Sequence, residues 1–430
     1  MLKVGAFGAL VLIVLALAFI GFRSATRGSP VTHVTTVGDK SGPPPIGDPL
    51  FRRTAEVVAK TALVPGNHVE VMINGDQTYP RLWADLRSAR RSITLQMYYA
   101  MPGRMADTLK AVLLGRAAAG VRVLFLHDAF GSGPLKKEYL DSLRTGGVTV
   151  ASFRPVHWYQ IHKAGTRSHI RVVVVDGSVG YTGGFGIADK WFGDGRSKDH
   201  WRDTNVRFIG PAVMQLQATF VAGWAEATGE LIVGDLFFPP DGFQSDGNQL
   251  ASLMHTAPTI GSTAAERFLA LSIASARKKL YISNSYFVPD DDFRRLLKDA
   301  ARRGVDVRIL TTSDQTDVKL TWRAGRARYE ELMQGGVKVY EYQPTMMHAK
   351  TLVADGLWST VGTMNFDNRS MVFNDESNLV ALDATLGATL DSVFVEDLKY
   401  AKEMKLEEFR RRPWTERMAE KFSSLFSRVL

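Results

Sequence analysis

The stretch "SHIRVVVVDG" (residues 168–177) returns as "MHAKTLVADG" (residues 347–356), roughly 180 residues further along the chain. Each copy has a histidine, a basic residue two positions later, an apolar run and an Asp-Gly pair. A short apolar run that is bounded by turn residues is typical of a buried β-strand. The sequence therefore predicts two similar strands, each with a histidine and a basic residue near its start.

The sequence around both strands repeats in the same order. Three further pairs of segments match: "SARRSITLQMYY" (88–99) with "SARKKLYISNSYF" (275–287), "AAAGVRVLFLHD" (117–128) with "ARRGVDVRILTTS" (301–313), and "TGGVTVASFRP" (145–155) with "QGGVKVYEYQP" (334–344). A period this long indicates a duplicated domain rather than a solenoid. We predict two domains, residues 51–245 and 246–400, with their junction within residues 237–249.

Apolar β-branched runs alternate with helical patterns in each half. Residues 275–287 and 305–311 read as strands, and residues 290–304 read as a helix with an acidic first turn and a glycine at its end. This alternation predicts α/β domains with a largely parallel sheet that helices cover.

The spacing within the repeated strand predicts which side chains share a face. His169 and Arg171 are two residues apart, as are His348 and Lys350, so each pair points to the same side of its strand. Asp176 and Asp355 follow their histidines by seven positions, an odd number. We therefore interpret these two aspartates first as turn and support residues.

Donor-rich turns follow both strands. Gly183, Gly184 and Gly362 let backbone N–H groups approach an anion closely, and Thr363 and Asn365 add side-chain donors. Two histidines, two cations and two such turns suit a phosphodiester. A neutral histidine attacks phosphorus and a protonated one gives its proton to the leaving oxygen. This chemistry needs no metal and no cofactor.

The pattern H-x-K-x4-D-x6-G-(G/S/T)-x-N, present twice, resembles the phospholipase D superfamily. The second copy matches throughout, with His348, Lys350, Asp355, Gly362 and Asn365 at the defining positions. The flanking segments "NFDNRSMVFNDESN" (365–378), "TGGFGIADKWFGD" (182–194) and "HWRDTNVRFIGPAV" (200–213) are similar to the bacterial cardiolipin synthase branch. The resemblance covers nearly all of residues 60–400.

This resemblance implies a fold and a division of roles. It implies two α-β-α sandwich domains related by a pseudo-twofold axis, with one shared active site within a single chain. His169 would form a phosphohistidine intermediate and His348 would act as the general acid. The resemblance also counts Arg171, Asp176, Lys350 and Asp355 among the catalytic residues of the two motifs. Asp203 and Glu376 fit the carboxylates that orient the two histidines, and such a partner would raise the pKa of its histidine. The two histidines need opposite protonation states, so their pKa values must be pushed apart.

The first copy departs from the family pattern at two positions. Arg171 stands where the family has lysine, and Gly186 stands where it often has asparagine. Arginine keeps the positive charge but differs in size and geometry. These changes leave open an active enzyme with an asymmetric pocket, a slowed enzyme or a protein that only binds.

Both ends of the chain indicate contact with a membrane. We predict a transmembrane anchor in residues 1–23. Residues 4–22 are uncharged and apolar and have basic residues on both sides, which favours a retained transmembrane helix over a cleaved signal peptide. Residues 24–50 are rich in Gly, Pro, Ser and Thr, as in a flexible linker. In the tail, residues 401–430, the part from 414 to 430 has apolar side chains at helical spacing, which fits either packing on the protein or contact with lipid head groups.

The whole-chain charge of +9 suits an anionic partner, and the absence of cysteine excludes thiolate sites. The anchor and the branch resemblance favour a phosphatidyltransferase in a cell membrane, the bacterial inner membrane by resemblance, that makes cardiolipin from phosphatidylglycerol. Hydrolysis by water, a nucleic-acid enzyme and a non-catalytic lipid binder are the alternatives, and we expect no nucleic-acid partner. A metal site at His157, His162 and His200 is disfavoured. Tyr98, Tyr99 and Tyr286 line either the pocket or the core.

Overall fold

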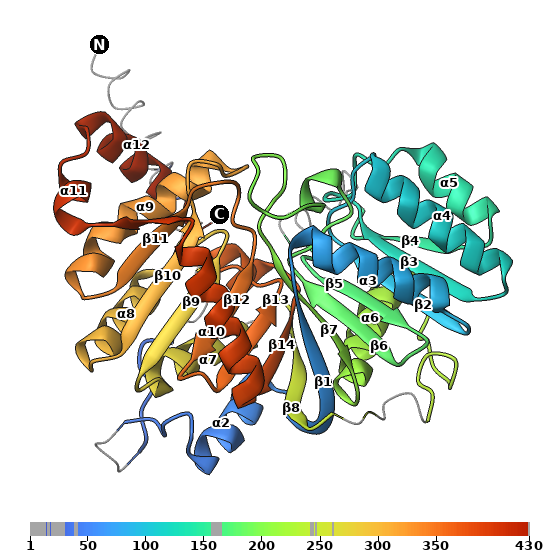
Figure 1. Ribbon diagram of the computed structural model, residues 1–430, viewed down its shortest axis with the longest axis horizontal. Coiled ribbons are helices and arrows are strands. Elements are labelled where there is room, and N and C mark those ends of the chain that lie inside the picture. The colour runs from blue at the N-terminus through green and yellow to red at the C-terminus, as the bar shows by residue number, and fades with distance from the viewer. Residues whose placement is uncertain are drawn as a thin grey trace.

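The computed structural model describes residues 14, 18, 31–37, 42–155, 166–240, 245, 247–259 and 262–428. Within these residues one mixed sheet of 15 strands runs through the whole molecule, and helices lie in front of it and behind it (Figure 1). The strand order is β15-β11-β10-β9-β12-β13-β14-β8-β1-β7-β6-β5-β2-β3-β4. The chain is thus an α/β protein with helices on both faces of its sheet.

The first half of the chain forms one side of this sheet. Its strands are β1 (Val64–Ile73), β2 (Ser92–Met97), β3 (Arg122–Asp128), β4 (Thr149–Phe153), β5 (Arg171–Val175), β6 (Val179–Gly183) and β7 (Thr204–Ile209). Its helices are α3 (Asn74–Ser88), α4 (Arg104–Ala118), α5 (Lys137–Thr145) and α6 (Ala212–Thr228), with a short 3₁₀ turn at Asp189–Trp191.

The second half forms the other side. Its strands are β8 (Gln249–Thr256), β9 (Lys279–Asn284), β10 (Asp306–Thr312), β11 (Lys338–Tyr342), β12 (Lys350–Ala354), β13 (Trp358–Gly362), β14 (Glu376–Leu382) and β15 (Ala401–Met404). Its helices are α7 (Ala264–Ser275), α8 (Asp291–Arg302), α9 (Lys319–Gln334) and α10 (Ala384–Leu398), with a π-helical turn at Arg369–Phe373. Asp290 caps α8 as the acidic first turn predicts.

The duplication seen in the sequence is visible in the strand order. Outward from the centre of the sheet, the first half reads β1-β7-β6-β5-β2-β3-β4 and the second reads β8-β14-β13-β12-β9-β10-β11. Each strand of the first half therefore has a counterpart in the second half, where β15 adds a further strand at the edge, and β1 and β8 pair at the centre. Figure 1 shows α3 in front of the first half and α6 behind it, and α10 in front of the second half and α7 behind it.

The expectation of a largely parallel sheet is wrong, because only part of each half is parallel. Strands β2, β3 and β4 are parallel, as are β9, β10 and β11, and helices connect them. The strands β5-β6-β7 and β12-β13-β14 are antiparallel. Asp176–Gly177 and Asp355–Gly356 have positive φ at both residues, as in the tight turns that join hairpin strands.

The ends of the chain pack mainly on the second half. In the predicted linker, Ile46 lies in the core and Asp48 caps α2 (Pro49–Ala59), which packs on α7. After β15 the tail forms α11 (Leu406–Arg410) and α12 (Trp414–Ser424), and α12 lies on α9. No helix among the described residues is long and apolar enough to cross a bilayer. Apart from Val14 and Ala18, the predicted span of residues 4–22 lies outside those residues.

Candidate active site

The two motif segments are held by backbone contacts with the opposite half. Isolated bridges join Ser168 to Asp375 and Arg202 to Met347. The backbone N–H of His169 donates to the carbonyl of Asp375 (2.9 Å), and that of His348 donates to the carbonyl of Arg202 (2.6 Å). Each histidine is therefore placed by a segment of the other half.

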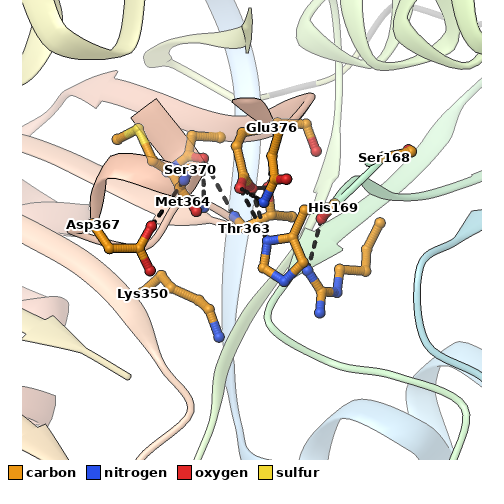
Figure 2. A network of polar contacts seen from close by, with 12 residues as sticks. Ser168, His169, Lys350, Thr363, Met364, Asp367, Ser370 and Glu376 are labelled. Carbon is orange, nitrogen blue, oxygen red and sulfur yellow. Dashed lines mark hydrogen bonds and ion pairs between the residues drawn. The ribbon is translucent and has the colours of Figure 1, made fainter. Parts of the chain in front are cut away.

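Each histidine also contacts a carboxylate that comes from the opposite half of the chain. His169 Nδ1 lies 3.0 Å from Glu376 Oε2, and Figure 2 shows these two side chains directed toward each other. His348 Nδ1 lies 2.9 Å from Asp203 Oδ2. All four side chains are buried. An Nδ1–H that donates to a carboxylate fixes the tautomer and leaves Nε2 as the reactive nitrogen.

The two cations of the motifs occupy the same buried region. Lys350 Nζ donates to the His348 carbonyl (2.7 Å) and lies 2.9 Å from His348 Nε2. Arg171 donates through Nη1 to the His169 carbonyl (2.7 Å) and through Nε to the Phe185 carbonyl (3.2 Å). Figure 2 shows Lys350 and His169 reaching into one space from different elements. The charges of Arg171 and Lys350 act on both histidines.

The glycines of both turns are required by close packing. A Cβ on Gly184 would collide with the Asp203 carboxylate, and one on Gly362 would collide with the Ser377 carbonyl. Gly183 has a φ of 148°, which favours glycine. Thr363 takes the place of Gly184 in the second half, and its hydroxyl donates to Glu376 Oε2 (2.5 Å).

The corresponding turn positions Gly186 and Asn365 have different structural settings. A Cβ on Gly186 would lie 2.9 Å from the ring of Trp191, so the indole fills the space that a side chain would need. The corresponding Asn365 is buried, and its Oδ1 has no hydrogen-bond partner within the described residues. Asn365 therefore retains an unused acceptor in the second half, whereas the first half has an indole there.

Aromatic side chains surround the histidines, and sequence reasoning identified only part of this group. Trp191 donates through Nε1 to Asp203 Oδ2 (3.0 Å), and its ring centroid lies 5.1 Å from that of His348. The ring centroid of Trp201 also lies 5.1 Å from that of His348. Tyr98 contacts His169 at 5.0 Å between centroids, which places it at the site. The two tryptophans were missed because they stand in irregular charged segments, where no strand or helix period relates them to the histidines.

The prediction that a carboxylate partner raises the pKa of each histidine is wrong. Burial and the charge of Arg171 hold the pKa of His169 well below 6.5. Burial and the charge of Lys350 do the same to the pKa of His348. Desolvation and two neighbouring cations outweigh the carboxylates, so both imidazoles are neutral at pH 7 when no anion is bound. Burial also lowers the pKa of Lys350 to about 7.

The two carboxylates differ in acidity. Burial raises the pKa of Asp203 to about 6, and Lys350 and hydrogen bonds from Thr204 and Trp191 limit this rise. Burial raises the pKa of Glu376 to about 8. Near pH 7 the carboxylate beside His348 is therefore the more readily ionised of the two.

Asp176 and Asp355 lie outside this group. The carboxylate of Asp176 accepts from the backbone N–H groups of Arg90, Arg91 and Ser92, and that of Asp355 accepts in the same way from residues 277–279. Both sit at the far ends of their strands, five residues or roughly 16 Å beyond the cations. These hydrogen bonds join each hairpin to the neighbouring strand, which fits the support role that the odd spacing indicates better than the catalytic role that the motifs imply.

Within the described residues, no group of three or more His, Asp or Glu side chains is arranged to hold a metal ion. His157 and His162 lie outside those residues. His200 contacts Ser197 through its ring nitrogen (2.9 Å). Tyr99 lies against the Trp191 ring, and Tyr286 donates to Asp317 (2.6 Å).

Comparison with known proteins identifies the family of the chain. Residues 269–398 match the family model "Cardiolipin synthase, PLD-like domain". The chain is 33% identical to cardiolipin synthase of Alkalihalophilus pseudofirmus over 89% of its own length and 76% of the relative's. It is 31% identical to cardiolipin synthase A of Pseudomonas syringae, covering 91% of this chain and 83% of that one.

A solved structure shares the fold. Phosphatidylserine synthase of Haemophilus influenzae superposes with a TM-score of 0.69 at 13% identity, covering 89% of this chain and 100% of that one. The mixed sheet and the paired histidine sites define a phospholipase D-like α/β protein. Within that class, the chain belongs to the cardiolipin synthase family.

Proposed function

We propose that this chain is a membrane-anchored phosphatidyltransferase that makes cardiolipin from phosphatidylglycerol through a phosphohistidine intermediate. The observation that carries the proposal is the crosswise pairing of His169 with Glu376 and of His348 with Asp203. Because each half supplies the carboxylate for the other's histidine, the functional unit comprises both proposed domains, residues 51–245 and 246–400.

In the first step, His169 Nε2 attacks the phosphorus of one phosphatidylglycerol. A P–N bond forms, the P–O bond to glycerol breaks, and His348 gives its proton to the glycerol oxygen. In the second step, His348 removes the proton from a hydroxyl of another phosphatidylglycerol. That oxygen attacks the phosphorus, the P–N bond breaks, and cardiolipin leaves with His169 restored.

The protonation of His348 follows from binding of the substrate. The phosphodiester brings a negative charge between Arg171 and Lys350 and offsets the cations that lower the histidine pKa values. Asp203 has a pKa of about 6 and is ionised at pH 7, so it favours an imidazolium on His348. The Glu376 pKa of about 8 gives less support to a charge on His169, which suits the nucleophile.

The remaining residues of the motifs hold the phosphoryl oxygens. Lys350 and Arg171 supply positive charge, and the amides at Gly183 and Gly184 and the side chain of Asn365 supply hydrogen bonds as charge develops in the transition state. Thr363 keeps Glu376 in place through its hydroxyl. These assignments give each half-site one cation and one donor-rich turn.

Transfer to a lipid is favoured over hydrolysis by the burial of the site. His169 is 7% exposed and His348 is 4% exposed, which limits access of water to the intermediate. Residues 4–22 are proposed as a single-pass anchor in a cell membrane, the bacterial inner membrane in view of the relatives. Such an anchor keeps the site at the surface where its substrates lie.

The test is purified full-length chain with vesicles of phosphatidylglycerol, followed by lipid chromatography and mass spectrometry. We expect cardiolipin and free glycerol in equal amounts. Phosphatidic acid as the main product would mean hydrolysis. No lipid product together with cleavage of single-stranded DNA would overturn the lipid assignment.

A further inference from the structure

The C-terminal helix α12 lies on the protein with its polar side inward. The side that faces α9 carries Glu420 and Ser423, and both are buried. The opposite side and the turn that follows it carry large exposed apolar side chains, which we call the outer stripe: Trp414 (73% exposed), Met418 (58%), Phe422 (60%), Leu425 (50%) and Phe426 (40%). A surface helix normally buries its apolar side. Packing within the described residues therefore gives no reason for these side chains.

A buried charge network fixes this rotation of the helix. Glu420 is 3% exposed and accepts from Arg326 Nε (3.0 Å) and from Arg412 Nη2 (2.7 Å). Arg326 also donates to Glu341 Oε1 (3.0 Å), which is buried as well. Turning the helix to bury its apolar side would leave these charges without partners, which is strongly unfavourable. The outward orientation of the stripe is built into the fold.

Basic side chains border the outer stripe. Arg417 and Lys421 are exposed and lie three residues after Trp414 and Met418, so they flank the stripe on one side. Arg411 is exposed just before the helix. An apolar stripe bordered by long basic side chains suits a helix that lies in a bilayer surface, because these side chains extend to the lipid phosphates.

Both ends of the described chain lie beside α8. Thr32 accepts through its carbonyl from Arg295 of α8 (3.4 Å), and Arg428 lines a small pocket together with Asp290, the residue that caps α8. The predicted anchor ends at residue 22, ten residues before Thr32, so the chain between them can span at most about 36 Å. An anchored chain therefore keeps the start of α8, and with it Arg428 after α12, within this reach of the membrane surface. Figure 1 shows α12 at the outer edge of the second half.

The C-terminal segment is connected to the active site through residues 368 and 369. Asn368 donates through Nδ2 to the carbonyl of Arg428 (2.6 Å). Asn368 is followed by Arg369, whose charge acts on His169. The C-terminal segment thus contacts the loop that follows the second motif.

We propose that the outer stripe of α12 docks into the headgroup region of an anionic phospholipid bilayer and holds the loop around Asn368 toward that surface. The purpose of docking rests on the proposed function, whereas the docking itself rests on the stripe, the charge network and the basic border. The other occupants of the stripe, residues 4–22 of the same chain or a second copy, are outcomes of the test.

The chain has no cysteine, so single-cysteine variants can be labelled cleanly. The full-length chain carrying Met418→Cys or Phe422→Cys is spin-labelled and reconstituted in vesicles of phosphatidylglycerol and phosphatidylethanolamine. Ser392→Cys, on an exposed position of α10, is the matched control. We expect labels at 418 and 422 to be accessible to oxygen and shielded from a water-soluble nickel chelate, and the control label to show the reverse. Labels open to the chelate, or shielded from both reagents by protein, would overturn the proposal.

A second measurement separates docking from catalysis. The double variant Met418→Glu/Phe422→Glu should lose roughly tenfold or more of its turnover on vesicles, since charged side chains do not enter a bilayer surface. Its turnover on a monomeric short-chain phosphatidylglycerol should stay within about twofold of the unmodified chain. Equal losses on both substrates would indicate damage to the fold and contradict the proposal. Absence of turnover in the unmodified chain would refute the proposed function, while the spin labels would still decide the docking.

Discussion

The two half-sites share one plan but differ in three details. Both have a histidine on a carboxylate from the opposite half and a cation two residues later. Beside His169 stand the weaker acid Glu376, an arginine and the ring of Tyr98. Beside His348 stand Asp203, a lysine and the two indoles.

The difference shows how a duplicated site can divide one reaction into two roles. Two identical half-sites would give both histidines the same affinity for a proton. A pKa of about 6 for one carboxylate and about 8 for the other favours the proton on His348. The first motif departs from the family pattern at Arg171 and Gly186. These departures are therefore compatible with a site in which one histidine is the nucleophile and the other is the acid.

Replacement of either histidine should have the largest effect. His169→Gln and His348→Gln should each lower transfer by roughly 10³-fold or more, because a triad-like unit fails when one member is lost. A phosphodiester with a good leaving group, such as p-nitrophenol, needs no general acid. It should restore release of the leaving group in His348→Gln but not in His169→Gln.

The control is His68→Gln, an exposed histidine on β1, which should leave transfer unchanged. Rescue of His169→Gln instead of His348→Gln by the activated substrate would reverse the assigned roles.

Removal of the carboxylates tests the acidity difference. Asp203→Asn and Glu376→Gln should each lower kcat by roughly 10²-fold, since each leaves its histidine without its orienting partner. In the unmodified chain, Asp203 is protonated as pH falls through about 6, so activity should fall below that pH. This acid limb should be absent from the residual activity of Asp203→Asn. An unchanged limb in that variant would assign it to another group.

Trp191→Phe should have a smaller effect. The change keeps an aromatic ring but removes the Nε1–H bond to Asp203, which helps to hold the pKa of that carboxyl down. We expect kcat to fall roughly threefold to tenfold, with the acid limb moved to higher pH. Trp83→Phe, in the core against Tyr79, is the control and should not move the limb. A pH profile identical to that of the unmodified chain would reduce Trp191 to a packing role.

Arg171→Lys should have the smallest effect. Lysine keeps the charge but cannot donate at once to the carbonyls of His169 and Phe185 as the guanidinium does. We expect turnover within about threefold of the unmodified chain, in either direction. Complete loss would mean that the first half-site depends on the shape of arginine.

The sequence predicted what depends on local pattern. The duplication, the paired histidines and cations, and the support role of Asp176 and Asp355 all follow from spacing along a strand. The Asp-Gly hairpins were mistaken for part of a parallel sheet, because strand–helix alternation was extended to segments without helices. The crosswise contacts join residues that are 207 and 145 positions apart, and no local period shows which histidine takes which carboxylate.

Two other features depend on packing in three dimensions. The effect of burial on the histidines exceeds that of their carboxylates, which a list of neighbouring charges could not show. The outward apolar side of α12 has the same sequence pattern as an inward one, and only the buried Glu420 network distinguishes them.

The most direct test of the account is to trap the covalent intermediate and locate it. Full-length His348→Gln is mixed with a short-chain phosphatidyl ester of p-nitrophenol, whose leaving group needs no general acid, quenched at alkaline pH and analysed by peptide mass spectrometry. The account predicts a phosphatidyl adduct on His169 alone. An adduct on another residue, or adducts on both His169 and His348 in the unmodified chain, would contradict a single site with one nucleophile and one acid.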